Sequence, residues 1–173
     1  MTSLHEPVME LVRAALDPAA EQARPRMDSP ACQVVVRAAE ADIEAGGADN
    51  LHQLAVGAGV AAAGLTAWLA QERDLEPTDI LTELEQAHAA HGRLSAPVLE
   101  MLKSLLTGPP GMQQTAEFMV TLFYEDEEGF YDLIVDLGAY VAVCIGMLNT
   151  LGISSQEQTL EDLASMLTTF YTA

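Results

Sequence analysis

Residues 49–73 of the chain read DNLHQLAVGAGVAAAGLTAWLAQER, and residues 131–151 read YDLIVDLGAYVAVCIGMLNTL. Neither stretch shows the alternation of apolar and polar residues that is typical of a strand, so both are expected to be helical. Because they are the longest apolar stretches of the chain, they decide the fold. No charged residue lies in 54–71 or in 137–156. Stretches of this length that are apolar on every side are typical of helices buried inside a bundle. We therefore predict two long central helices.

Both stretches also approach the length that a membrane-spanning helix needs. The first consists mainly of Ala and Gly, which drive insertion weakly, and the second begins with Asp132 and Asp136 and has no flanking Lys or Arg. We interpret both as buried helices of a soluble bundle and expect no membrane contact. The first 17 residues contain Glu6 and Glu10 and no basic region before an apolar stretch, so they do not match a secretory signal. We expect a cytoplasmic protein.

Comparison of the chain with itself indicates an internal duplication. Residues 7–16 align with 97–106 at an offset of 90, with the same Pro, Val, Glu and final Leu. Further along the chain, an offset of 79 pairs Gly59 with Gly138. Residues between these two aligned blocks match at an offset of 85. The order of the matches is preserved, and the decreasing offset means that the second repeat has shorter loops than the first. The sequence predicts two repeats packed as one compact domain, residues 1–90 and 91–173.

Each repeat contains four helical segments, and no stretch alternates with period two for long enough to form a strand. The run Gly108-Pro109-Pro110-Gly111 is expected to end the first helix of the second repeat. The acidic run 125–128 is expected to be a solvated loop. The predicted fold class is all-α, a bundle of about eight helices: 7–16, 30–45, 49–73 and a segment after residue 79 in the first repeat, and 97–106, 112–124, 131–151 and a segment after residue 155 in the second.

Small residues recur every four positions in both long helices. They are Gly59, Ala63 and Ala67 in the first and Gly138, Ala142 and Gly146 in the second. Residues four apart share a helical face, so each helix carries a stripe with few side-chain atoms. Glycine inside a helix costs about 0.5–1 kcal/mol relative to alanine, so such a stripe normally has a packing reason. We predict that the two stripes meet across a pseudo-twofold axis, although Ala-rich composition alone would also place small residues there.

Two acid–histidine pairs at helical spacing are candidate metal ligands, because carboxylate-bridged metal bundles use the spacing Glu-x-x-His. The pairs are Glu85 with His88 and Asp49 with His52. The second repeat has Tyr131 in place of His52 and a leucine in place of His88, so no duplicated metal site exists. Capping or surface roles are therefore favoured for these histidines. The chain has no glycine-rich phosphate loop, nucleophile elbow or cysteine pair at metal spacing. We predict no catalytic residue and no cofactor.

The charge is strongly one-sided: 7 Lys and Arg oppose 26 Asp and Glu, which gives a formal net charge of −19. This balance argues against binding to nucleic acid or to anionic membranes, because both need cations to meet phosphates. It is consistent with a basic partner. The chain has a single lysine, Lys103, and much alanine. Genomic base composition is therefore a second explanation of the acidity.

These observations leave several functions open. The absence of catalytic motifs and the acidity favour a non-catalytic interaction or regulatory protein, which binds a protein partner or a second copy of itself as a homodimer. A second function is the binding of an apolar small molecule in a pocket between the two central helices. The charge alone is also consistent with mimicry of nucleic-acid phosphates. A metal-dependent enzyme is least favoured; it would use Asp49, His52, Glu85 and His88.

Overall fold

The computed structural model describes residues 4–17, 30–47, 49–89, 96–106 and 109–172. These residues form eight helices and no strand, which confirms the predicted all-α class. In chain order the helices are α1 (Glu6–Leu16), α2 (Pro30–Ala45), α3 (Asp49–Glu72), α4 (Pro77–Ala89), α5 (Ala96–Leu106), α6 (Pro109–Glu125), α7 (Glu127–Thr150) and α8 (Gln156–Thr172).

Two boundaries in the second half differ from the predicted ones. Helix α5 ends at Leu106, before the Gly108–Gly111 run, as predicted, but α6 begins at Pro109 and not at residue 112. A proline in the first turn of a helix loses no intrahelical hydrogen bond, so Pro109 and Pro110 can begin α6. Helix α7 begins at Glu127, so most of the expected acidic loop is helical. Asp126 caps it by accepting a hydrogen bond from the backbone N–H of Gly129 at 3.0 Å. The carboxylates of Glu127 and Glu128 then lie in the first turn, where they stabilise the helix dipole.

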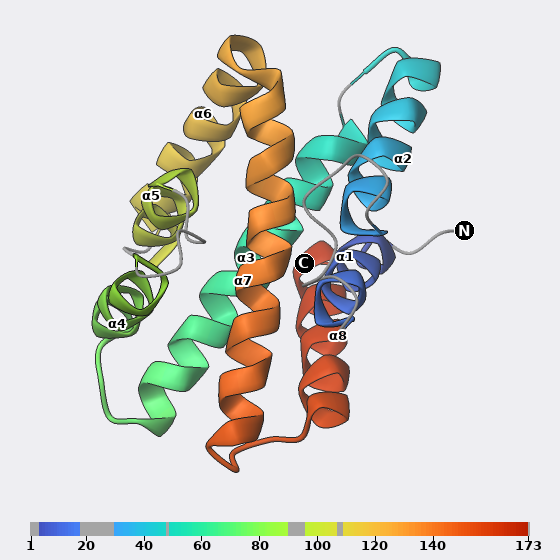
Figure 1. The fold of residues 1–173 in the computed structure, drawn as a ribbon. Helices are drawn as coiled ribbons and strands as arrows, with labels where there is room; N and C mark the ends of the chain where they lie inside the picture. The colour runs from blue at the N-terminus through green and yellow to red at the C-terminus, as the bar shows by residue number, and fades with distance from the viewer. Residues whose placement is uncertain (1–3, 18–29, 48, 90–95, 107–108, 173) are drawn as a thin grey trace.

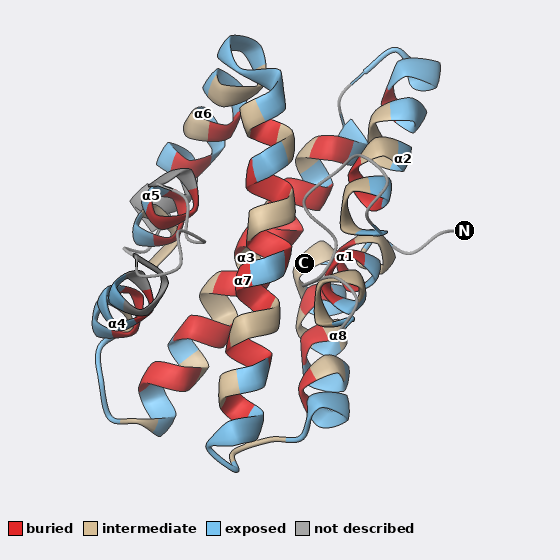
Figure 2. Cartoon of the chain, viewed as in Figure 1, coloured by how far each residue is buried: buried red, intermediate tan, exposed pale blue. Residues whose placement is uncertain are grey.

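The two long helices α3 and α7 form the centre of the bundle and pack along each other (Figure 1). On one side of this pair lie α4, α5 and α6, and on the other side lie α1, α2 and α8. The large fully buried side chains include Leu69 of α3 and Phe130, Leu133 and Ile145 of α7. The apolar runs that dominate the sequence therefore line one shared core, as predicted (Figure 2).

The first helix of each half packs against the central helix of the other half. Helix α1 lies on α7, and α5 lies on α3. Leu11 of α1 contacts Gly138, and Met101 of α5 contacts Gly59. Leu11 and Met101 are 90 residues apart, and the two glycines are 79 apart, which are the offsets of the proposed duplication. The duplication stays a prediction, and this matched pair of contacts is one of its expected consequences.

Both central helices are long and apolar enough to cross a membrane when judged by length and composition alone. In the folded chain, 61% of the most apolar window of α3 and 50% of that of α7 are buried among other helices. Core helices of water-soluble bundles meet the same composition test, so this finding is weak evidence for a membrane.

Candidate functional site

The two acid–histidine pairs lie on different helices, and only one pair has described side chains. Asp49 and His52 lie in the first turn of α3, whereas α4, which contains Glu85 and His88, follows the opposite end of α3 (Figure 1). The side chains of Glu85 and His88 lie outside the described residues. Among the residues that the structure describes, no group of three or more His, Cys, Asp and Glu side chains could hold a metal ion.

His52 is part of an aromatic cluster. Its ring packs against Phe123 of α6 at 5.4 Å between ring centroids and against Phe130 of α7 at 5.6 Å. Phe123 and Phe130 also meet edge to face at 5.5 Å. Such tilted and edge contacts are the favoured arrangements of aromatic rings. The cluster fastens the beginning of α3 to the α6–α7 hairpin, which gives His52 a packing role.

At Gly59 and Gly138 the stripes face side chains of other helices rather than each other, whereas the predicted meeting of their alanines stays a prediction. At Gly138 an added Cβ would lie 2.7 Å from Cγ of Leu11, and at Gly59 it would collide with Met101. Helices α5 and α1 thus fill the space that the two glycines leave. The last stripe positions, Ala67 and Gly146, are exposed. Ala63 and Ala142 are half-buried.

A buried polar cluster connects α3 to α7. Thr66 Oγ1 donates to the carbonyl oxygen of Ala62 at 2.7 Å, so the Tyr140 hydroxyl donates to Thr66 Oγ1 at 2.6 Å. The Cys144 thiol lies against both hydroxyls, and burial raises its pKa to about 12, an effect that hydrogen bonds with Tyr140 and Thr66 partly offset. Because the thiolate is the reactive form, Cys144 is not an activated nucleophile. The cluster is structural.

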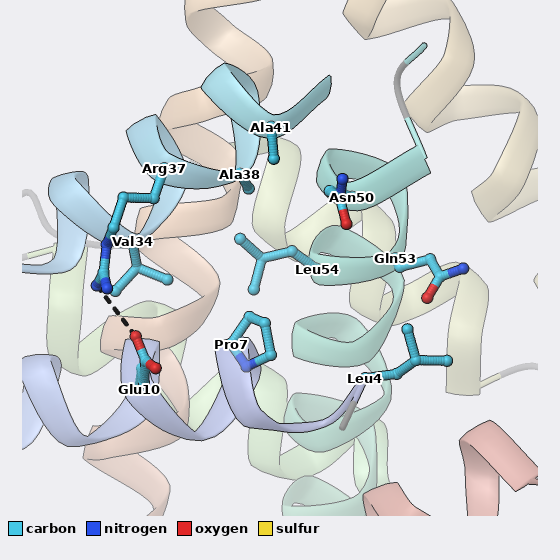
Figure 3. A pocket seen from close by; sticks show the side chains of 10 residues that line it. All are labelled: Leu4, Pro7, Glu10, Val34, Arg37, Ala38, Ala41, Asn50, Gln53 and Leu54. Atoms are coloured by element: carbon cyan, nitrogen blue, oxygen red, sulfur yellow. Dashed lines mark hydrogen bonds and ion pairs between the residues drawn. The ribbon is translucent and has the colours of Figure 1, made fainter. Parts of the chain in front are cut away.

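One pocket lies between α1, α2 and α3 rather than between the two central helices (Figure 3). Its volume is about 280 Å³. Pro7, Val34 and Leu54 give it an apolar wall, and the ion pair between Arg37 and Glu10, 3.0 Å long, closes one side. The amides of Asn50 and Gln53 lie on the opposite side, as Figure 3 shows.

A second, more open groove of about 410 Å³ lies beside the C-terminal half of α7. Val143, Gly146 and Met147 line it on one side. On the other side Arg73 donates to Glu83 at 2.7 Å. The groove is thus mostly apolar, with a single ion pair at its edge.

The most distinctive surface belongs to α6, α7 and α8. Residues 104–173 contain ten acidic residues and no Lys, Arg or His. The structure exposes nine of the ten, all except the half-buried Asp136. The nine exposed acids are Glu117, Glu125, Asp126, Glu127, Glu128, Asp132, Glu157, Glu161 and Asp162.

Two large apolar side chains of α6 are exposed within this acidic surface. Tyr124 of α6 is 80% exposed, and Val120, one helical turn earlier, is 44% exposed. Figure 2 shows that the end of the molecule where α6 turns into α7 is largely exposed. Neither residue stands out in the sequence, because an apolar residue on a helix next to a core position looks the same whether or not another helix covers it.

Comparison of the chain with protein-family models, with curated proteins and with solved structures found no match. We therefore infer its function from its own residues and their arrangement.

Proposed function

We propose that the protein is a non-catalytic interaction protein that recognises a cationic protein partner. The observation that supports this most directly is the charge of α6, α7 and α8, whose exposed carboxylates have no Lys, Arg or His among residues 104–173 to pair with. A surface of one sign attracts the opposite charge across about 8–10 Å at ordinary ionic strength and speeds association with it.

The ion pairs that the structure describes do not involve the α6–α8 surface. The ion pairs that join described side chains are His5–Glu6, Arg37–Glu10 and Arg73–Glu83, and all six partners belong to residues 1–90. Arg37 and Arg73 are therefore already engaged with acids of their own half. A partner that supplies Lys or Arg would gain charge-assisted hydrogen bonds with the α6–α8 surface.

The test is direct binding of the full chain to labelled peptides of equal length. One peptide set carries about six lysines, a second set is neutral, and a third carries about six glutamates. Fluorescence anisotropy should show saturable binding of the cationic set alone, with an affinity that falls as salt rises from about 0.05 to about 0.3 M. Equal binding of the neutral set, or none of the cationic set at low salt, would reject the proposed function.

Self-association remains a proposal of its own. The groove beside α7 and the exposed side chains of Leu75 and Leu151 are apolar surface that a second copy could cover. Because every copy carries the charge of −19, screening should favour association. Light scattering should therefore give a larger mass at about 0.5 M than at about 0.02 M salt. A monomer mass at both would refute self-association through apolar faces.

The pocket of Figure 3 supports a second candidate function, the binding of a small molecule that is apolar with one polar end. Ala41→Phe places a ring at the pocket, whereas Ala45→Phe, one turn later on α2, places the same ring outside its lining. Native mass spectrometry of the purified protein should then detect a bound species that Ala41→Phe removes and Ala45→Phe keeps. The absence of a bound species from the unaltered protein would remove this candidate.

A further inference from the structure

We infer that the outer face of α6 is the docking surface for the cationic partner, and that the partner presents a basic amphipathic helix to it. This inference rests on the proposed function and adds the location and the chemistry of the partner. The docking surface is defined here as Ala116, Glu117, Val120 and Tyr124 together with Glu125 and Glu128 at the turn into α7.

The apolar residues of this surface form a line along the helix. Ala116, Val120 and Tyr124 follow one another at intervals of four residues, and all three are exposed. Residues four apart share one face of a helix. The line therefore extends over about 12 Å, at a rise of about 1.5 Å per residue. Two turns of a second helix laid along α6 would match that length with apolar residues at the same spacing.

Tyr124 is the expected anchor of the contact. Its ring meets Phe123 edge to face at 5.4 Å on one side, and 80% of the residue is exposed. Tyrosine loses little conformational freedom on binding and is enriched among the residues that dominate interface affinity. A partner that covers the free side of this ring would bury most of the exposed apolar area of α6.

The charges around the line determine which partner fits. Glu117 lies three residues before Val120 on the same helical face, and Gln113 donates to its carboxylate at 3.5 Å. Glu125 and Glu128 are exposed at the far end of the line, near Tyr124. Lysine or arginine residues on either side of an apolar stripe would meet these carboxylates at the rim of the contact.

A second copy of this chain does not fit the same face. Helices α6, α7 and α8 have no Lys, Arg or His, so two such faces would bring like charges together. Any self-association must therefore use another surface, which leaves the α6 face for a different, basic chain.

The test compares variants of the full chain in binding a labelled helical peptide of lysine and leucine with an amphipathic pattern. Tyr124→Ser removes the anchor and should weaken binding by about tenfold or more. The triple variant Glu117→Gln, Glu125→Gln, Glu128→Gln removes three rim charges. Its matched control, Glu157→Gln, Glu161→Gln, Asp162→Asn, removes the same number of exposed charges from α8. Circular dichroism checks that each variant keeps its helices.

The expected result is a weaker complex for Tyr124→Ser and for the α6–α7 triple variant, and little change for the α8 triple variant. An equal loss for both triple variants, with no effect of Tyr124→Ser, would overturn the docking surface while the proposed function stands. Failure of the unaltered chain to bind any cationic peptide would overturn the proposed function itself. The two failures are thus distinguished by the behaviour of the unaltered chain.

Discussion

At the scale of single residues, the two glycines of the central helices show how a missing side chain can position a neighbouring helix. Leu11 is fully buried where it meets Gly138, so α1 approaches α7 closely only because no Cβ stands between them. Gly146 lies on the same helix with nothing within 4 Å of an added Cβ. Glycines of one stripe therefore differ in what they do.

Substitution by alanine should separate these glycines. Gly138→Ala should lower the free energy of unfolding by about 1–3 kcal/mol, because its Cβ would meet the branched Cγ of Leu11 and overpack the core. Gly59→Ala should cost less, since the atom it meets is the flexible end of Met101. Gly146→Ala is the control and should stabilise by up to about 1 kcal/mol through helix propensity. Urea unfolding measures all three; equal effects at Gly138 and Gly146 would contradict the packing role.

Burial of Cys144 also makes stability depend on pH. Because the folded state raises the pKa of its thiol from 9.0 to about 12, the folded protein holds that proton more tightly than the unfolded chain does. This contribution is complete below pH 9 and is lost as pH rises toward 12. The free energy of unfolding should fall in this range, and less steeply in Cys144→Ala. Identical slopes for the two proteins would contradict the assignment.

At the scale of elements, hydrogen bonds between distant residues decide where the helices begin and how they join. The carboxylate of Asp42, which is only 3% exposed, accepts the backbone N–H groups of Asn50 at 2.8 Å and Leu51 at 2.9 Å. Asp42 belongs to α2, yet it caps the first turn of α3. Local sequence rules look for a cap next to the helix, so they cannot find this one.

The Thr66–Tyr140 pair should behave as one unit that joins α3 to α7. Thr66→Val removes the oxygen acceptor of the buried Tyr140 hydroxyl and leaves it only the weak sulfur acceptor of Cys144, and we expect a loss of about 1–3 kcal/mol. In the double variant with Tyr140→Phe both partners are apolar, so its loss should be smaller than the sum of the single losses. Denaturant unfolding of the unaltered chain, the two single variants and the double variant measures the coupling between the two hydroxyls. Simple additivity would mean that the two hydroxyls are not coupled.

At the scale of the whole molecule, the crossing of α1 onto α7 and of α5 onto α3 makes the two halves depend on each other. Leu11 is buried by a helix of the second half, and Met101 by a helix of the first. Each half alone would expose these apolar faces to water. We therefore expect the two halves of the bundle to fold as one unit.

A chain divided within residues 90–95 tests this dependence. Each fragment alone should show no cooperative unfolding transition, because the helices of the other half that bury its apolar faces are missing. Mixed in equal amounts, the fragments should form a complex of one copy each with the far-ultraviolet circular dichroism of the intact chain. A fragment that folds cooperatively by itself would show that the halves are independent domains.

The sequence alone was sufficient for the helices of the bundle and for the identity of its two central ones. Helix periodicity and long apolar runs are properties of consecutive residues, so they predict the elements before any packing is known. The same local view also found the glycines that need a packing reason and the excess of acids.

Only the tertiary structure decided which surfaces meet. In the folded chain Gly138 contacts Leu11 and Gly59 contacts Met101, His52 packs among aromatic rings, and Tyr124 is exposed. The physical reason is that covering a helical face depends on residues far away in the chain, whose contribution no window of consecutive residues contains. The candidate docking surface exists because no part of the described fold covers Tyr124, and only three-dimensional packing can show that.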